Sequence, residues 1–170
     1  MSIHQQFGSI YDTYVDKIYR FIFVKVSSQM VAQDLTSETF TRTFEYISRN
    51  NAKRIDNMQA FLYRTALNIV TDHYRQKSRG EVPLEYESRQ VVEMEVPERN
   101  RADLAVMQSE QMAQIQTALQ NMDREYANVV MWHYIEDLSL KEIAEILERP
   151  EGTVRVMLHR GLKELRALLR

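Results

Sequence analysis

Apolar residues recur at intervals of three and four along most of this chain, which is the period of an amphipathic helix. In the first half, this pattern predicts three long helices, at about 8–26, 30–48 and 57–78. In the second half, it predicts four shorter helices, at about 106–121, 124–135, 139–147 and 151–169. Between the two sets the pattern lapses, and Gly80, Pro83 and Pro97 interrupt the chain. We therefore predict an all-α protein.

The lapse in the pattern predicts two small helical domains joined by a linker. The first domain would span residues 1–79, the linker 80–105 and the second domain 106–170. The linker is strongly acidic, and unstructured loops of this length are uncommon inside a compact domain. A long solvated loop within a single domain is the alternative that the sequence leaves open.

Three of the predicted helices begin at residues that can cap a helix. Ser139 with Glu142 three residues on forms a capping box, and Asp123 suits the N-cap of the helix before it. Asp56 with Gln59 resembles a second capping box, at the start of the third helix. These side chains would satisfy backbone N–H groups that have no partner within the helix.

The amino-acid composition excludes several classes of protein. Four Gly and three Pro in 170 residues leave little material for the turns of an all-β fold. The chain has no Cys, which excludes a disulfide and a thiolate metal site. It shows neither a membrane-spanning apolar run nor a signal peptide, so we expect a cytoplasmic protein without membrane insertion. The His residues are scattered and no catalytic motif occurs, so we expect no catalytic residue, no metal, no cofactor and no enzyme activity.

Positive charge is concentrated in the last 22 residues, although the formal net charge of the chain is -2. Residues 139–165 contain two short amphipathic helices around a break at Pro150, which is the arrangement of a helix-turn-helix. Val154, Leu158, Leu162, Leu165 and Leu169 share the inward face of the second helix. The residues expected to contact DNA are Arg149, Gly152, Thr153, Arg155, Val156, His159, Arg160 and Lys163. An ordinary helical hairpin with a solvated basic face is the alternative.

The outward face of the predicted third helix combines an aromatic ring with polar and basic groups. Such a surface suits single-stranded nucleic acid, because bases stack on the ring while cations hold the backbone. Phe61 lies near the middle of this face, although at a helix start it could instead tuck under the preceding loop. The candidate residues here are Asn50, Asn51, Lys53, Arg54, Phe61, Arg64, Asn68, Asp72 and Arg75.

The predicted second helix carries two different stripes. The apolar stripe contains Leu35, Phe40, Phe44 and Ile47. The other stripe is mainly acidic and contains Asp34, Glu38, Thr41 and Glu45. A solvated face is the simplest interpretation of the acidic stripe. A docking surface for a basic partner helix is the alternative, because complementary charge steers encounter and sets register.

Taken together, these segments resemble the extracytoplasmic-function group of sigma factors in the sigma-70 family, over nearly the whole chain. Residues 34–40 match the D-L-T-Q-E-T-F pattern of region 2, with Ser37 in place of Gln. Residues 60–79 are similar to the W-L-Y-R-I-A-R-N-x-x-I-D-x-x-R-R stretch, with Phe61 in place of Trp. Residues 139–165 resemble region 4 and its G-T-V-K-S-R-L-x-R-A pattern. In that pattern Val156 and Met157 stand where Ser and Arg are usual.

The resemblance implies an alternative sigma factor that binds core RNA polymerase and directs it to specific promoters for transcription initiation. Region 2 would melt and read the minus-10 promoter element through the third-helix surface, and region 4 would recognise the minus-35 element. The implied polymerase contacts are the clamp helices of the largest subunit and the flap of the second subunit. The residues implied at the clamp contact are Asp34, Leu35, Glu38, Phe40 and Thr41.

The resemblance also implies an anti-sigma factor as a partner. The missing cation at Met157 predicts fewer phosphate contacts and a shallower salt dependence of DNA binding. Val156 lies at the centre of the outward face, where we hypothesise that it packs on a thymine methyl group. A stand-alone helix-turn-helix transcriptional regulator, with the first domain as a sensor or dimer module, is the alternative function.

Overall fold

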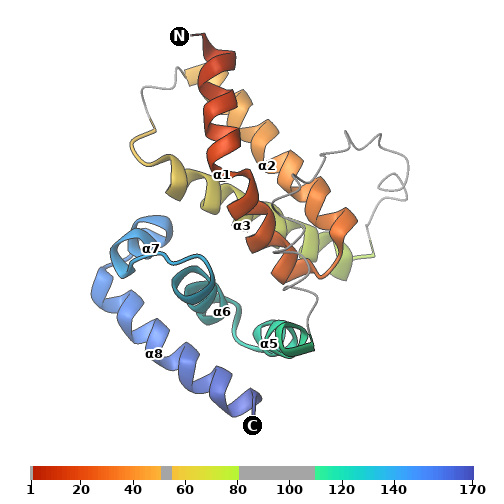
Figure 1. Cartoon of the computed structure of the whole chain (residues 1–170), viewed down its shortest axis with the longest axis vertical. Helices are drawn as coiled ribbons and strands as arrows, with labels where there is room; N and C mark the ends of the chain where they lie inside the picture. Colours follow the sequence, from red (N-terminus) through yellow and green to blue (C-terminus); the bar gives the residue numbers. More distant parts are fainter. Residues whose placement is uncertain (1, 51–54, 81–109) are drawn as a thin grey trace. The chain divides into compact units, whose positions relative to one another are not determined.

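The computed structural model describes residues 2–50, 55–80 and 110–170, and these described residues contain helices and turns but no strand. The all-α prediction is therefore confirmed. The chain divides into two compact units, one within residues 1–95 and one within 96–170 (Figure 1). Apart from Gly80, the predicted linker lies outside the described residues, and its boundaries stay a prediction.

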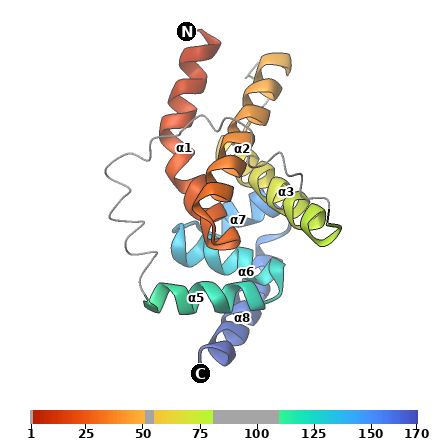
Figure 2. The same ribbon diagram turned by 90° about the vertical axis from the view of Figure 1, so that its right-hand side faces the viewer.

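The first unit is built from α1 (Ile3–Val26), α2 (Gln29–Asn50) and α3 (Met58–Ser78). Two residues connect α1 to α2, and these helices run antiparallel, with α3 packed on both (Figure 2). The largest buried side chains come from all three helices and include Ile18, Phe21, Leu35, Ile47, Leu62, Tyr63 and Ile69. The Tyr63 ring packs edge-on against Phe21, with ring centroids 5.5 Å apart. The apolar stripes predicted from the sequence thus form one core.

Helix α1 begins at Ile3, five residues before the predicted start near residue 8. Ser2 caps it, since its hydroxyl accepts from the Gln5 backbone N–H and the Gln5 side chain accepts from the Ser2 N–H. The added turn also packs on α2, because the Phe7 ring lies 5.0 Å from the ring of Phe44. A cap at its start and an aromatic contact along its side therefore stabilise the first turn.

Of the three caps predicted from the sequence, two are confirmed and one is wrong. Ser139 and Glu142 form the expected capping box, and the Asp123 carboxylate accepts from two backbone N–H groups. Helix α3, however, is capped by Asn57 and not by Asp56. The Asn57 side chain accepts from the Ala60 N–H at 3.0 Å, which moves the helix start one residue along and leaves Gln59 outside the cap.

The described part of the second unit contains α5 (Glu110–Asn121), α6 (Arg124–Val130), the π-helix η3 (Met131–Ile135), α7 (Leu140–Leu147) and α8 (Glu151–Leu168). Residues 106–109, predicted to begin the first of these helices, lie outside the described residues. The single helix predicted over 124–135 is instead an α-helix that widens into a π-helix. Trp132, the chain's one Trp, is fully buried in η3.

Candidate nucleic-acid interfaces

The turn between α7 and α8 gives the second unit its helix-turn-helix form (Figure 1). After α7, Glu148 adopts a left-handed backbone conformation with φ 54°, and its N–H donates to the Ala144 carbonyl. Pro150 then precedes α8, and its carbonyl accepts from the N–H groups of Thr153 and Val154. The chain thereby passes from α7 to α8 within three residues, and α8 packs on α6 and α7. The helix-turn-helix interpretation is confirmed at the level of the fold.

Burial along α8 separates an inward face from an outward face. Val154, Met157, Leu158 and Gly161 are buried. Every candidate DNA-binding residue of this segment is exposed: Arg149, Gly152, Thr153, Arg155, Val156, His159, Arg160 and Lys163. Leu169, predicted to face inward, is instead exposed, because α8 ends at Leu168 and Leu169 lies beyond its last turn. The outward face of α8 is therefore basic and open to solvent.

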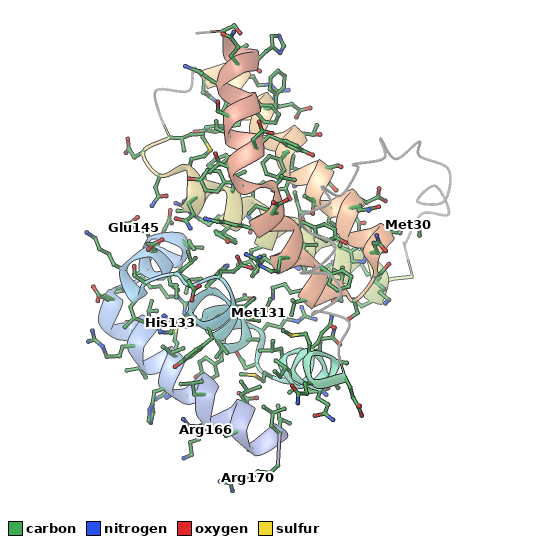
Figure 3. All side chains as sticks on the ribbon, in the orientation of Figure 1. Met30, Met131, His133, Glu145, Arg166 and Arg170 are labelled. Atoms are coloured by element: carbon green, nitrogen blue, oxygen red, sulfur yellow. The ribbon has the colours of Figure 1, made fainter. Side chains whose placement is uncertain are left out.

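The basic character of α8 continues to its C-terminal end. Arg166 and Arg170 are both exposed and lie at that end of the helix (Figure 3). Near the start of α8, Arg155 pairs with Glu151 at 3.6 Å, and both side chains are more than half exposed. Exposed pairs of this kind contribute little energy, so Arg155 can exchange its partner for a phosphate at small cost.

Arg149 connects two elements of the second unit, in addition to being a candidate DNA contact. Its Nη2 atom lies 3.0 Å from Oε1 of Glu125 on α6. Its Nη1 atom lies 3.5 Å from the sulfur of Met157 on α8. Arg149 was already among the predicted DNA contacts, so it adds no cation to that set, and the shallower salt dependence stays a prediction.

Gly161 sets the distance between α8 and α6. A Cβ atom added at this position would lie 2.8 Å from Cγ2 of Val130 and 3.2 Å from the carbonyl oxygen of Tyr126. A larger residue therefore does not fit unless α6 or α8 shifts. This contact helps to fix the angle at which α8 projects from the second unit.

In the first unit, the predicted aromatic surface is a pair of rings from two helices. The Phe61 ring, half-buried at the start of α3, lies 4.9 Å from the ring of Tyr46 on α2. Tyr46 is itself exposed and was missed by the sequence analysis. Its place one residue before Ile47 of the apolar stripe puts it at the edge of that stripe, which is the signal that could have identified it. The two rings offer a larger stacking surface than Phe61 alone.

The other residues predicted for this surface differ in their exposure. Asn68, Asp72 and Arg75 are exposed on the outer side of α3, whereas Arg64 is half-buried. Asn50 is exposed at the end of α2, and its side-chain amide donates to the Tyr46 carbonyl at 3.1 Å. Asn51, Lys53 and Arg54 lie outside the described residues.

Two residues of the predicted polymerase contact on α2 are buried. Leu35 is 1% exposed and Phe40 3% exposed, so both side chains pack in the core and offer a partner protein almost no surface. Thr36 and Thr39 are also buried, and their hydroxyls donate to carbonyls of their own helix. Several positions of the matched pattern at 34–40 therefore fill the core of the first unit.

The remaining candidates on α2 lie at the surface. Thr41 is exposed, and Asp34 and Glu38 are partly exposed. The Glu38 carboxylate pairs with Arg42 one turn on. These three positions keep the acidic stripe available to a partner.

A polar hollow of about 280 Å³ separates the acidic stripe from the outer face of α3. Its lining residues come from both helices and are Leu35, Glu38, Arg42, Ile69, Asp72, His73, Arg75, Gln76 and Arg79. Burial lowers the pKa of His73, Lys77 lowers it further, and Glu38 acts in the opposite direction. The hollow thus lies between the acidic stripe of α2 and the polar outer face of α3.

Two further properties concern the described residues as a whole. Among them, no three His, Asp or Glu side chains come together in a way that could hold a metal ion. None of their helices has the length and apolar character needed to cross a lipid bilayer.

Comparison with known proteins places each candidate interface within a described family region. The family model for Sigma-70 region 2 matches residues 10–80, and the model for Sigma-70, region 4 matches residues 112–165. Among curated proteins, the ECF RNA polymerase sigma factor SigW of Bacillus subtilis is 33% identical, over 96% of this chain and 89% of that protein. BldN of Streptomyces coelicolor, also an ECF RNA polymerase sigma factor, is 29% identical, and this chain spans 60% of its length.

Solved structures agree with the fold. CnrH, solved in complex with the cytosolic domain of CnrY, matches with a TM-score of 0.65 and 20% identity, over 98% of this chain and 88% of that one. The sigma factor RpoE of Bartonella quintana, solved with the anti-sigma factor NepR, matches with a TM-score of 0.63 and 14% identity, over 97% of both chains. At these identities the likeness concerns the fold alone.

Proposed function

Since the chain belongs to the extracytoplasmic-function group of the sigma-70 family, we propose that it is an alternative sigma factor, which binds core RNA polymerase and directs it to specific promoters. The observation that carries this proposal is the order of the two matched regions, each of which lies within one compact unit. Proteins of this family are transcription initiation factors, so the chemistry of RNA synthesis belongs to the polymerase. The proposed place of action is the cytoplasm, where polymerase and promoter DNA are found.

Region 4 would bind the minus-35 element as a duplex. The outward face of α8 supports this role because its polar and cationic side chains are exposed while its apolar side chains are buried. Such a helix can enter the major groove, where Arg and Lys contact phosphates or guanine and short side chains allow close approach. His159, Arg160 and Lys163 would contribute to these contacts, together with Thr153 near the start of the helix.

Region 2 would open and hold the minus-10 element. Separated bases expose flat faces, and base stacking on aromatic side chains holds such bases without regard to their sequence. The Tyr46–Phe61 pair supplies two neighbouring rings, and Asn68, Asp72 and Arg75 supply polar groups on the same helix as Phe61. We assign the capture of unpaired bases to this ring pair.

Region 2 would also carry the main polymerase contact. The exposed part of the acidic stripe, Asp34, Glu38 and Thr41, suits a basic helix such as a clamp helix of the largest subunit. Leu35 and Phe40 would hold this stripe in place from the core. An anti-sigma factor is a further proposed partner, because two solved relatives of the same fold are described in complexes, one with an anti-sigma factor and one with the cytosolic domain of CnrY.

A reconstituted transcription assay tests this function. The purified chain is added to core RNA polymerase with a library of promoter fragments, and the transcript starts are sequenced. The proposal expects starts that share motifs near minus-35 and minus-10 and that require the added chain. Thr41→Arg, which places a cation within the acidic stripe at an exposed site, is expected to remove these starts. Specific binding to duplex DNA without any transcription would instead support the stand-alone regulator.

A further inference from the structure

One apolar side chain lies on the outward face of α8. Val156 is 49% exposed, and Thr153, His159 and Arg160, one turn away from it on either side, are exposed as well. The adjacent Met157 and the nearby Val154 are buried. With 3.6 residues per turn, Val156 lies within about 30° of the direction opposite the buried face. The Val156 side chain therefore projects toward the place where a duplex bound to α8 would come closest to the helix.

The chemistry of valine restricts what it can face in the major groove. The side chain has no hydrogen-bond donor or acceptor, so a polar base-edge atom pressed against it would lose its water and gain no partner. In unmodified DNA the apolar group of the major groove is the C5-methyl group of thymine. A valine at the protein–DNA interface therefore favours a thymine over the other three bases.

We propose that Val156 is a specificity-determining residue, which selects a thymine at one position of the minus-35 element by packing on its C5-methyl group. The inference rests on the proposed function, since it needs α8 to lie in the major groove. Arg160, one turn further along α8, and Thr153, one turn back, provide polar contacts on either side of this apolar point. Contacts of these two polar residues with the DNA can fix the position of Val156 along the groove.

The ion pair on the flank of α8 is compatible with this arrangement. Arg155 pairs with Glu151 one turn back, at 3.6 Å. On a helical wheel Arg155 lies about 100° and Glu151 about 140° from Val156, so the pair lies to one side of the outward face. The charges of this pair therefore do not point at the spot that Val156 would contact.

The test uses holoenzyme, made from the full chain and core polymerase, and a promoter fragment found by mapping transcript starts. Each thymine of the minus-35 element, on either strand, is replaced in turn by uracil, which removes the methyl group and nothing else. Burial of one methyl group corresponds to about a fourfold change in affinity. We expect about this loss of holoenzyme affinity at one thymine and none at the others.

The variant Val156→Ser identifies the side chain responsible. It is expected to bind the thymine and uracil fragments equally at that one position. Leu168→Ser is the matched control, because Leu168 is likewise an exposed apolar residue of α8 but lies near its far end. This control should keep the fourfold ratio between thymine and uracil. The fluorescence of buried Trp132 reports whether either variant disturbs the second unit.

Two results would overturn the inference and leave the proposed function standing. One is equal holoenzyme binding to thymine and uracil at every position of an element that is still read specifically. The other is a uracil effect that persists in Val156→Ser, since another residue would then read the methyl group. Holoenzyme that shows no sequence preference upstream of the start site would remove the proposed function of region 4, and this inference with it.

Discussion

The guanidinium of Arg149 lies 3.0 Å from the carboxylate of Glu125, which ties the turn before α8 to α6. The same guanidinium is a proposed contact for a promoter phosphate, so Glu125 and DNA would compete for it. Glu125→Gln is therefore expected to strengthen holoenzyme binding to a promoter about threefold and to steepen its salt dependence. Both side chains are well exposed, so the second unit should lose less than about 1 kcal/mol of stability. Measured affinities at several salt concentrations check this, and weaker binding would mean that the pair positions α8.

The two glycines of α8 are expected to respond in opposite ways to alanine. Gly161→Ala should destabilise the second unit by about 1 kcal/mol, because overpacking against Val130 and Tyr126 outweighs the gain in helix propensity. Gly152→Ala is the matched control, since an added Cβ there meets nothing within 4 Å. It should leave stability unchanged or raise it by up to about 1 kcal/mol. Urea unfolding followed by Trp132 fluorescence measures both, and equal effects would contradict the close helix contact.

The ring pair of region 2 predicts a defect in promoter opening. Phe61→Ala should slow or weaken opening by about tenfold, because stacking of one base on an aromatic ring contributes about 1–3 kcal/mol. Tyr46→Ala should have a similar effect, and the double variant should lose less than the two single losses combined, since the rings form one surface. Tyr134→Ala serves as a control for loss of an exposed tyrosine. Normal opening by both single variants would remove the pair from the proposed mechanism.

His73 predicts a pH dependence of the first unit. Burial, assisted by Lys77, lowers its pKa in the folded state below the usual 6.5, so the unfolded chain binds a proton more readily. The stability that depends on neutral His73 is therefore present above about pH 6.5 and is lost as the pH falls through the folded-state pKa. His73→Gln should flatten this part of the stability profile. Urea unfolding between pH 5 and 7.5, followed by NMR signals of α1–α3, checks the prediction, and an unchanged profile would contradict it.

The helices and their faces could be predicted from the sequence because they depend on local periodicity. Val154 and Leu158 were placed inside α8 by the wheel alone, and burial agrees. Local rules also found the caps at Asp123 and Ser139. They failed by one residue at α3, because Asp56 and Asn57 are adjacent and both residue types cap helices well.

The remaining features depend on contacts between elements. The early start of α1 relies partly on Phe7 packing against Phe44, which no periodicity within α1 can reveal. The Tyr46–Phe61 pair likewise exists only once α3 has packed on α2. Leu35 and Phe40 were assigned to a binding surface because a family pattern does not separate core positions from surface positions. The π-helix breaks the 3.6-residue period that the prediction assumed.

Permanganate reactivity of promoter thymines tests the central claim most directly, because this reagent attacks thymines whose bases are unstacked. The chain and core polymerase are added separately and together to a promoter fragment found by transcript mapping. If the chain is a sigma factor, thymines near minus-10 become reactive only when both are present, and Phe61→Ala reduces that reactivity. Thymines that stay unreactive with both components, on a fragment that the chain binds specifically as duplex, would contradict the account.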